Sequence, residues 1–355
     1  MGGSSMRYLN LSWLRVVMVL LLAFLLVGVV AGQDLNQKKQ ELIKKISEID
    51  QQLKAGATGA EREDLMKERE RLVAAVSDIN KKMMADAEMM KRINAVKKAY
   101  NDGNNAFKLG QLQEALNYYN KAISLDSTFY KAYYGRGLTL KKMRRYAEAI
   151  KSYQAAIRQN PNFAEAYFAL GKIYSGLNKP NDAIKTYELA IKNNPSLYKA
   201  YYELGAVYLN KKKNYRKAAE NFRKATQINP EYDLAFYSLG VSLTELGQFG
   251  DAIMALENAL AVTKRKKWAD PYYRLAVIYN KQGKYSKAKA AAAEALKNKR
   301  NYAPAAYEAG KASKDLGQYN EALNYFRIAA RNRVWKRAAE YEIDLIQNRD
   351  KYGGN

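Results

Sequence analysis

The stretch AEAYFALGKIY, residues 164–174, returns as YKAYYELGAVY at residues 198–208, 34 residues further along the chain. Both copies have the same order of small, aromatic and aliphatic residues, and Gly171 and Gly205 occupy the same position in each. Self-similarity at such a period predicts a repeat architecture, in which each unit buries its apolar side against neighbouring units.

The same pattern occurs seven times. A small residue stands at the key position of every copy, at steps of 34 to 36 residues: Gly103, Gly137, Gly171, Gly205, Gly240, Ala276 and Gly310. Each copy predicts two amphipathic helices joined by a short turn, and four of the turns contain a glycine: Gly110, Gly247, Gly283 and Gly317. Small residues let the helices approach closely, and larger rings are expected to fill the gaps between them: Tyr153, Tyr187, Phe222 and Phe326.

This pattern resembles the tetratricopeptide repeat family from Val96 to about Lys336. The resemblance implies an all-α fold: a right-handed α-solenoid of seven helix-turn-helix units, followed by a capping helix and tail at residues 337–355. The units would span residues 96–129, 130–163, 164–197, 198–232, 233–268, 269–302 and 303–336. The sequence departs from the family pattern by one extra residue in NKKKN (210–214), by two around TKRKKW (263–268), and by Ala292, where an aromatic residue is usual.

Residues 1–32 have the pattern of a secretory signal peptide. Arg7 and Arg15 precede an unbroken apolar run at residues 16–30, and small residues follow this run. Cleavage after Gly32 would leave Gln33 as the first residue; cleavage one residue earlier, or an uncleaved anchor at residues 16–32, are the alternatives. In each case we expect the rest of the chain to be exported, to the periplasm or another part of the cell envelope.

Residues 33–95 predict a helical stalk. Apolar residues recur with heptad spacing in two runs: Leu35, Leu42, Ile46, Ile49 and Leu53, then Leu65, Leu72, Val76, Ile79, Met83, Met90 and Ile93. Between the runs, Gly56 can end the first helix, and Thr58 with Glu61 matches a capping box that starts the second. Two arrangements remain open: an antiparallel hairpin within one chain, or a coiled coil that joins copies of the chain into a homo-oligomer through residues 34–93. No glycine or proline occurs between Gly59 and Gly103, so the second helix can continue into the first repeat.

The composition argues against an enzyme. The chain has no cysteine and no histidine, so it lacks a thiol nucleophile, the usual general base and the commonest zinc ligands. The sequence also contains no phosphate-binding glycine loop and no activated-serine motif. We therefore expect a non-enzymatic protein with no catalytic residues, no metal site and no cofactor.

The resemblance implies that the first helices line a concave groove, and that the residue three positions before each key residue faces this groove. The position is aromatic in all seven units: Tyr100, Tyr134, Phe168, Tyr202, Tyr237, Tyr273 and Tyr307. The predicted partner-binding set also contains polar residues between these rings: Asn104, Lys141, Lys172, Asn280 and Lys311. Rigid rings provide contact area at low entropic cost, and the lysines favour an acidic or C-terminal peptide segment as partner. The alternative is that the rings only cover neighbouring helices.

The net charge of +25 is concentrated in the repeats. Residues 33–95 contain 13 basic and 12 acidic residues, and residues 1–32 add two arginines, so residues 96–355 hold +22. Four runs of cations lie at predicted turns: residues 141–145, 211–213, 264–267 and 297–300. Such runs form either a solvated rim or a basic surface for an anionic polymer or membrane. We do not expect nucleic acid as a partner, because the protein is predicted to be exported and no nucleic-acid motif accompanies the charge.

Together these features predict an exported scaffold or adaptor, which binds a peptide segment or partner protein in the groove and takes part in cell-envelope assembly. The order of signal, coiled coil and repeat array is similar to that of the periplasmic coiled-coil and repeat proteins associated with the Tol–Pal envelope system. Two alternatives remain open: a binder of anionic envelope polymer or membrane, and a structural protein that assembles with itself.

Overall fold

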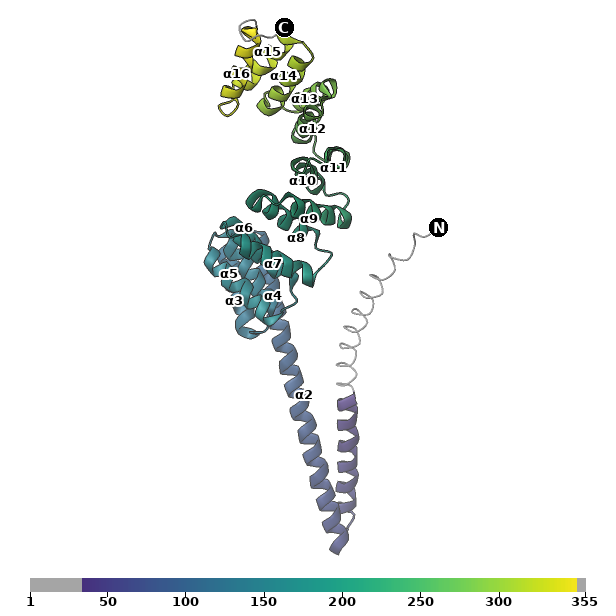
Figure 1. Cartoon of the computed structure of the whole chain (residues 1–355). Helices are drawn as coiled ribbons and strands as arrows, with labels where there is room; N and C mark the ends of the chain where they lie inside the picture. The colour runs from purple at the N-terminus through teal and green to yellow at the C-terminus, as the bar shows by residue number, and fades with distance from the viewer. Residues whose placement is uncertain (1–33, 350–355) are drawn as a thin grey trace, which may run out of the picture. The chain divides into compact units, whose positions relative to one another are not determined.

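The computed structural model describes residues 34–349, and these residues form helices connected by turns and loops (Figure 1). The predicted all-α class is confirmed. None of the helices in this part of the chain is long and apolar enough to cross a lipid bilayer. The predicted signal peptide lies outside the described residues.

The chain divides into two compact units. The first contains the described residues up to Asp102 together with residues 124–126, and the second contains residues 103–123 and the chain from Ser127 onward. The division lies inside helix α2 (Gly59–Lys108), whereas the sequence predicts a boundary at residue 95. The backbone gives no signal at residue 95 because the helix continues through it without glycine or proline.

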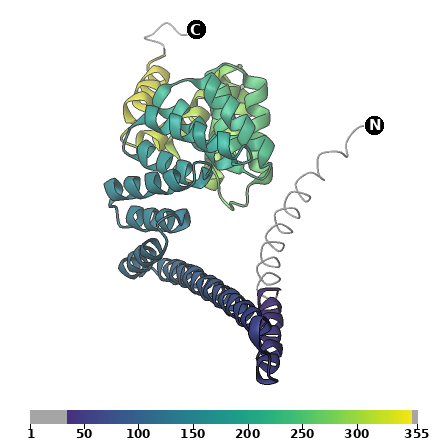
Figure 2. The same ribbon diagram turned by 90° about the horizontal axis from the view of Figure 1, so that it is seen from below.

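The first unit contains a helical hairpin. A helix at residues 34–54 ends in a turn at Gly56, whose φ of 103° suits glycine, and α2 begins at Gly59. The two helices lie side by side (Figures 1 and 2), and Nε of Arg69 donates a 2.7 Å hydrogen bond to Oδ1 of Asp50 between them. Ile49 in the heptad seam is buried, and most other seam residues are half-buried. The hairpin is therefore confirmed within one chain, and the joining of copies through residues 34–93 stays a prediction.

The second unit is a stack of helix pairs. The first helices of the pairs are α4 (Tyr130–Lys142), α6 (Ala164–Gly176), α8 (Tyr198–Val207), α10 (Asp233–Glu245), α12 (Asp270–Lys281) and α14 (Ala303–Asp315). The second helices are α5 (Tyr146–Gln159), α7 (Pro180–Asn193), α9 (Tyr215–Ile228), α11 (Phe249–Val262), α13 (Tyr285–Asn298) and α15 (Tyr319–Ala330). Residues 103–108 of α2 pair with α3 (Leu112–Leu125) at one end, and α16 (Lys336–Gln347) follows α15 at the other.

A large side chain of the second helix fills the space beside the key glycine of the first. A Cβ atom on Gly171 would lie 2.6 Å from Cε1 of Tyr187, and one on Gly310 would lie 2.7 Å from Cε1 of Phe326. Both distances are shorter than real Cβ contacts, so only glycine allows the ring to take this position. The predicted complementarity of small residues and rings is therefore confirmed.

The sixth repeat replaces this pair by two alanines. Ala276 takes the place of the key glycine, and Ala292 takes the place of the ring; both are fully buried and pack in one cluster with Ala309. Because Ala276 has a Cβ atom where the other repeats have glycine, no space is left for a ring, and the facing position on the second helix holds an alanine. The departure of Ala292 from the repeat pattern is explained by the departure of Ala276.

The turns within the repeats all use a residue in the left-handed backbone region. Gly110, Gly247, Gly283 and Gly317 have φ values between 67° and 79°, as their turn positions predict. In the other three turns the same role falls to Arg144, Asn178 and Lys213, with φ values of 62°, 57° and 53°. The extra residue of NKKKN is accommodated by a π-helical turn, η1 (Tyr208–Lys212), between α8 and the start of the next helix.

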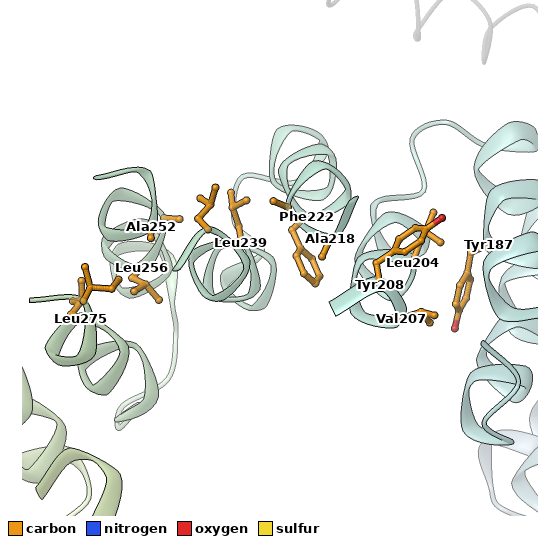
Figure 3. Close-up of a cluster of buried hydrophobic side chains, with 14 of the residues drawn as sticks. Tyr187, Leu204, Val207, Tyr208, Ala218, Phe222, Leu239, Ala252, Leu256 and Leu275 are labelled. Carbon is orange, nitrogen blue, oxygen red and sulfur yellow. The ribbon is translucent and has the colours of Figure 1, made fainter. Parts of the chain in front are cut away.

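The apolar core passes from repeat to repeat. One buried cluster includes Tyr187, Leu204, Phe222, Leu256 and Leu275 and so extends from α7 to α12 (Figure 3). Each repeat therefore completes its core with side chains of its neighbours, as expected for a stack in which no unit buries its apolar face alone.

Candidate functional site

The candidate site lies on the first helices of the stack. Some successive first helices contact one another directly: α6 with α8, α10 with α12, and α12 with α14. We call the surface formed by α4, α6, α8, α10, α12 and α14 the first-helix face. It carries six of the seven predicted ring positions, because Tyr100 belongs to the first unit.

The six rings form a ladder that is half-buried: Tyr134, Phe168, Tyr202, Tyr237, Tyr273 and Tyr307. Four ring pairs join the ladder to the second helix of the same repeat, with centroids 5.5 to 6.0 Å apart: Tyr134–Tyr153, Phe168–Tyr187, Tyr202–Phe222 and Tyr307–Phe326. These contacts support the alternative in which the rings cover neighbouring helices, and they leave part of each ring exposed for a partner.

A second set of aromatic residues, which the sequence reasoning missed, also packs on the ladder. Five ring pairs have centroids 5.0 to 5.7 Å apart: Tyr134–Phe163, Tyr202–Tyr232, Tyr237–Trp268, Tyr273–Tyr302 and Tyr307–Trp335. The second member of each pair stands one or two residues before the next helix of the stack. An aromatic residue at this recurring place is the signal that the sequence offered.

Burial raises the pKa of three of the ladder hydroxyls. It raises the pKa of Tyr202 and Tyr273, and it raises the pKa of Tyr307 to about 12, with further contributions from Glu342 and Glu308. A phenol with a raised pKa presents a neutral O–H group to a partner at physiological pH.

Two lysines lie near one carboxylate in the N-terminal half of the face, and only one of them forms an ion pair with it. Nζ of Lys172 on α6 lies 3.2 Å from Oε1 of Glu203 on α8. Lys141 on α4 is half-buried and has no ion pair among the residues that the structure describes. Burial lowers the pKa of Lys141, the charge of Lys172 lowers it further, and Glu203 opposes both effects. An anionic group from a partner would balance this excess of positive charge.

The charges in the C-terminal half of the face are balanced by the protein itself. Nζ of Lys314 lies 2.6 Å from Oε2 of Glu342, and Nζ of Lys311 lies 3.9 Å from Oε2 of Glu308. The buried Glu308 also accepts a 2.8 Å hydrogen bond from Nδ2 of Asn280. Two predicted site residues, Asn280 and Lys311, are thus engaged with Glu308.

Asn104 is engaged in a similar way in the first repeat. Its Oδ1 accepts a 2.8 Å hydrogen bond from the hydroxyl of Tyr119, a ring on the second helix of the same repeat. Across residues 34–349, no three acidic side chains gather in a way that would hold a metal ion.

The second helices form hollows that the sequence reasoning did not consider. Three hollows of equivalent construction, with volumes of about 290, 560 and 310 Å³, lie between successive second helices and the first helix that separates them. The largest is lined by residues of α5, α6 and α7, including Arg158, Tyr167 and Asp182. They are shallow surface features, and none contains a ladder ring.

The sequence matches known repeat families over the same helices. The description "TPR repeat" matches residues 103–143 and 145–178, and "Tetratricopeptide repeat" matches residues 164–197, 211–271 and 269–302, which together span more than half of the chain. No curated protein matches the chain.

Solved structures of other repeat proteins are similar to this fold. A structure of pilF from Pseudomonas aeruginosa has a TM-score of 0.52 and 14% identity, and the match covers 61% of this chain and 96% of that one. MamA has a TM-score of 0.43 and 26% identity, covering 45% of this chain and 92% of its own. YrrB, described as a TPR protein with an unusual peptide-binding site, has a TM-score of 0.41 and 24% identity, covering 52% and 90%.

Proposed function

Because this chain belongs to the tetratricopeptide repeat family, we propose that it is an exported, non-enzymatic adaptor that binds an acidic peptide segment of a partner protein on its first-helix face. Arrays of this family are scaffolds for protein–protein and peptide interactions. The observation that carries the proposal is the half-buried Lys141, which lies near the Lys172–Glu203 pair and has no carboxylate of its own in the described residues.

A carboxylate of the partner fits this place for an electrostatic reason. Lys141 carries its charge in partly desolvated surroundings, next to the like charge of Lys172. An ion pair formed there gains more than one on the open surface, where solvent screens it. The half-buried rings of Tyr134 and Phe168 on the same helices supply apolar contact area beside the charge.

The proposed location is the cell envelope. The apolar run at residues 16–30 behind two arginines supports export, and the repeat array would then meet its partner outside the cytoplasm. A role in envelope assembly is part of the same proposal.

The test measures binding of a fluorescent polyglutamate peptide with a free C-terminus to the chain starting at Gln33, which contains every described residue. Substitution of Lys141→Ala together with Lys172→Ala is expected to weaken binding roughly tenfold to a hundredfold, because two charge-assisted contacts are lost. Fluorescence anisotropy at moderate salt gives the dissociation constants.

The last repeat offers a matched control. Lys311 follows its key glycine by one residue, as Lys172 does, and Lys314 follows it by four, as Lys141 does. Lys311→Ala with Lys314→Ala should change the affinity less than about threefold, because these lysines already have carboxylate partners. Equal losses in both double variants, or no loss in either, would contradict the proposed site.

A further inference from the structure

The loops that connect one repeat to the next differ in charge along the stack. The first four, residues 126–129, 160–163, 194–197 and 229–232, contain two acidic residues and no basic residue. The last three, residues 263–269, 299–302 and 331–335, contain eight basic residues and no acidic residue. We call these last three loops the basic edge, because connections between successive helix pairs lie along one edge of a stack.

Direct contacts hold the loops of the basic edge beside one another. The hydroxyl of Tyr302 in the second loop donates a 2.6 Å hydrogen bond to Oδ1 of Asp270, which follows the first loop. Tyr302 also packs with Ala269 of the first loop in one apolar cluster. Trp335 of the third loop packs on Tyr307, the ladder ring of the helix that follows the second loop.

Most of the cations on the basic edge have no ion pair. Within residues 34–349 only Lys264 and Arg265 form ion pairs, with Glu231 at 3.6 Å and with Asp233 at 3.1 Å. The other six have no ion pair among the described residues: Lys266, Lys267, Lys299, Arg300, Arg331 and Arg333. All six are exposed, so the edge presents unneutralised charge to its surroundings.

An apolar side chain stands among these charges. Val334 lies between Arg333 and Trp335 in the third loop and is 84% exposed, the highest value among the large hydrophobic residues that the structure describes. A protein in water gains nothing from placing a branched aliphatic side chain at a loop tip. The combination of cations with an exposed apolar residue is typical of surfaces that meet the headgroup and acyl boundary of a bilayer.

The other cation runs of the sequence lie elsewhere. Residues 141–145 and 211–213 include the turns within repeats, which link α4 to α5 and η1 to α9. These turns lie at the end of each helix pair opposite to the connections between repeats. The four runs therefore do not form one surface.

We propose that the basic edge binds the surface of an anionic lipid bilayer. Lysine and arginine side chains of three adjacent loops would contact lipid phosphates, and Val334 would enter the boundary between headgroups and acyl chains. A soluble anionic polymer satisfies the charge equally well but offers no apolar phase to Val334, and for this reason the bilayer is the better match. This surface is separate from the residues of the first-helix face that would hold a peptide.

The test uses the chain starting at Gln33, which lacks the apolar run at residues 16–30. Vesicles of phosphatidylcholine, alone or in equimolar mixture with phosphatidylglycerol, are sedimented with the protein. Binding to the anionic vesicles and not to the neutral ones is expected. The protein that starts at Gln33 lacks Trp13 and keeps two tryptophans, Trp268 and Trp335, which both lie on the basic edge, so quenching of their fluorescence by brominated lipids reports on contact there.

Two variants with equal charge change locate the binding surface. The edge variant carries Lys266→Glu, Lys267→Glu, Arg300→Glu and Arg333→Glu, and the control variant carries Lys211→Glu, Lys212→Glu, Lys281→Glu and Lys284→Glu in or beside turns within repeats. All eight side chains are exposed, so both variants are expected to fold. The edge variant should bind anionic vesicles roughly a hundredfold more weakly than the parent, and the control should lose less than about tenfold.

Three results would overturn the proposal. They are absence of binding to anionic vesicles, equal losses in the two variants, and complete competition by short-chain polyphosphate without any effect of Val334→Ser on the affinity for vesicles. The last result would identify a soluble polyanion as the partner. Under the proposal, Val334→Ser weakens vesicle binding several-fold and leaves polyphosphate binding unchanged.

Discussion

The hairpin and the repeat array pack helices by different means. Residues 34–99 contain no phenylalanine, tyrosine or tryptophan, and the hairpin is held by one seam of aliphatic and methionine side chains that is mostly half-buried. In the array, fully buried rings such as Tyr187 and Phe222 stand beside glycines and alanines. The seam requires only that apolar residues recur with heptad spacing. The array requires a small residue on one helix wherever the facing helix carries a large ring.

The difference appears in what each region leaves exposed. On α2 in the first unit, Met84 is 74% exposed although it adjoins the seam. In the array, each second helix carries a pair of alanines seven residues apart, such as Ala183 and Ala190 on α7, and both members of every pair are completely buried. A change of side-chain volume is therefore expected to cost more in the array than in the hairpin.

Alkaline pH should separate the two regions most strongly. Burial raises the pKa of Tyr153 and Tyr187 above the ordinary value of 10.0, and that of Tyr307 to about 12. A raised folded-state pKa means that stability is intact below pH 10 and is lost as the pH rises through the folded-state value. We expect the array to unfold as the pH rises beyond 10, while the hairpin, which has no tyrosine at residues 34–99, keeps its helices.

Phenolate absorbance and circular dichroism, recorded together, check this expectation. The absorbance of buried phenolates should appear in the same transition as the loss of most of the helix signal. Exposed tyrosines ionise without unfolding the protein, so only ionisation of all the tyrosines at pH 10 to 11 without loss of helix would show that the buried rings are accessible to solvent, and it would break the comparison.

The array contains two kinds of facing pair, a glycine with a ring and an alanine with an alanine, and converting one kind into the other tests whether the two sizes depend on each other. Gly171→Ala should destabilise the protein by about 1–3 kcal/mol, because the new methyl group meets the ring of Tyr187. In the sixth repeat, Ala292→Tyr should also destabilise, and the addition of Ala276→Gly should recover at least about 1 kcal/mol of that loss. Urea unfolding of the single and double variants gives the coupling energy. If the effects of Ala276→Gly and Ala292→Tyr on the free energy of unfolding simply add, the sizes of these two residues do not depend on each other.

The smallest expected effect on stability comes from removing a ring hydroxyl group while keeping the ring. The hydroxyl of Tyr153 is buried and has no partner among the described residues, whereas that of Tyr119, at the equivalent place in the preceding repeat, donates to Asn104. Tyr153→Phe should leave stability unchanged or raise it by less than about 1 kcal/mol, and Tyr119→Phe should lower it by about 0.5–1.5 kcal/mol. Thermal unfolding of both variants under the same conditions measures the difference, and equal shifts would contradict it.

The repeat period predicts the fold well because the residues that recur are the ones at which neighbouring helices contact each other. Key glycines, paired alanines and rings recur where two helices touch, so Gly171 and Tyr187 could be identified from spacing alone. The left-handed turns at Arg144 and Lys213 could not, because neither residue type signals that conformation as glycine does.

The candidate site was less predictable from the same repeat. The period identifies which positions face the first-helix side, but it assigns the same role to Lys172 and Lys311. Only the structure shows that Glu308, buried and held by Asn280, lies next to Lys311, and that Lys141 forms no ion pair with any carboxylate of the described residues. Contacts between neighbouring repeats decide these differences, and a pattern within one repeat does not contain them. The resemblance in domain order to Tol–Pal-associated proteins stays a prediction.

An inserted residue normally shifts the phase of every residue that follows it in a helix by about 100°. In the fourth repeat the additional residue of NKKKN is taken up within the five residues of η1, and the shift is cancelled before α9 begins. Ala218 and Phe222 consequently remain in the core, in register with their counterparts in the other repeats. The widened turn makes an insertion at this point neutral for packing, whereas the same insertion within α2 would turn the rest of the heptad seam away from its partner.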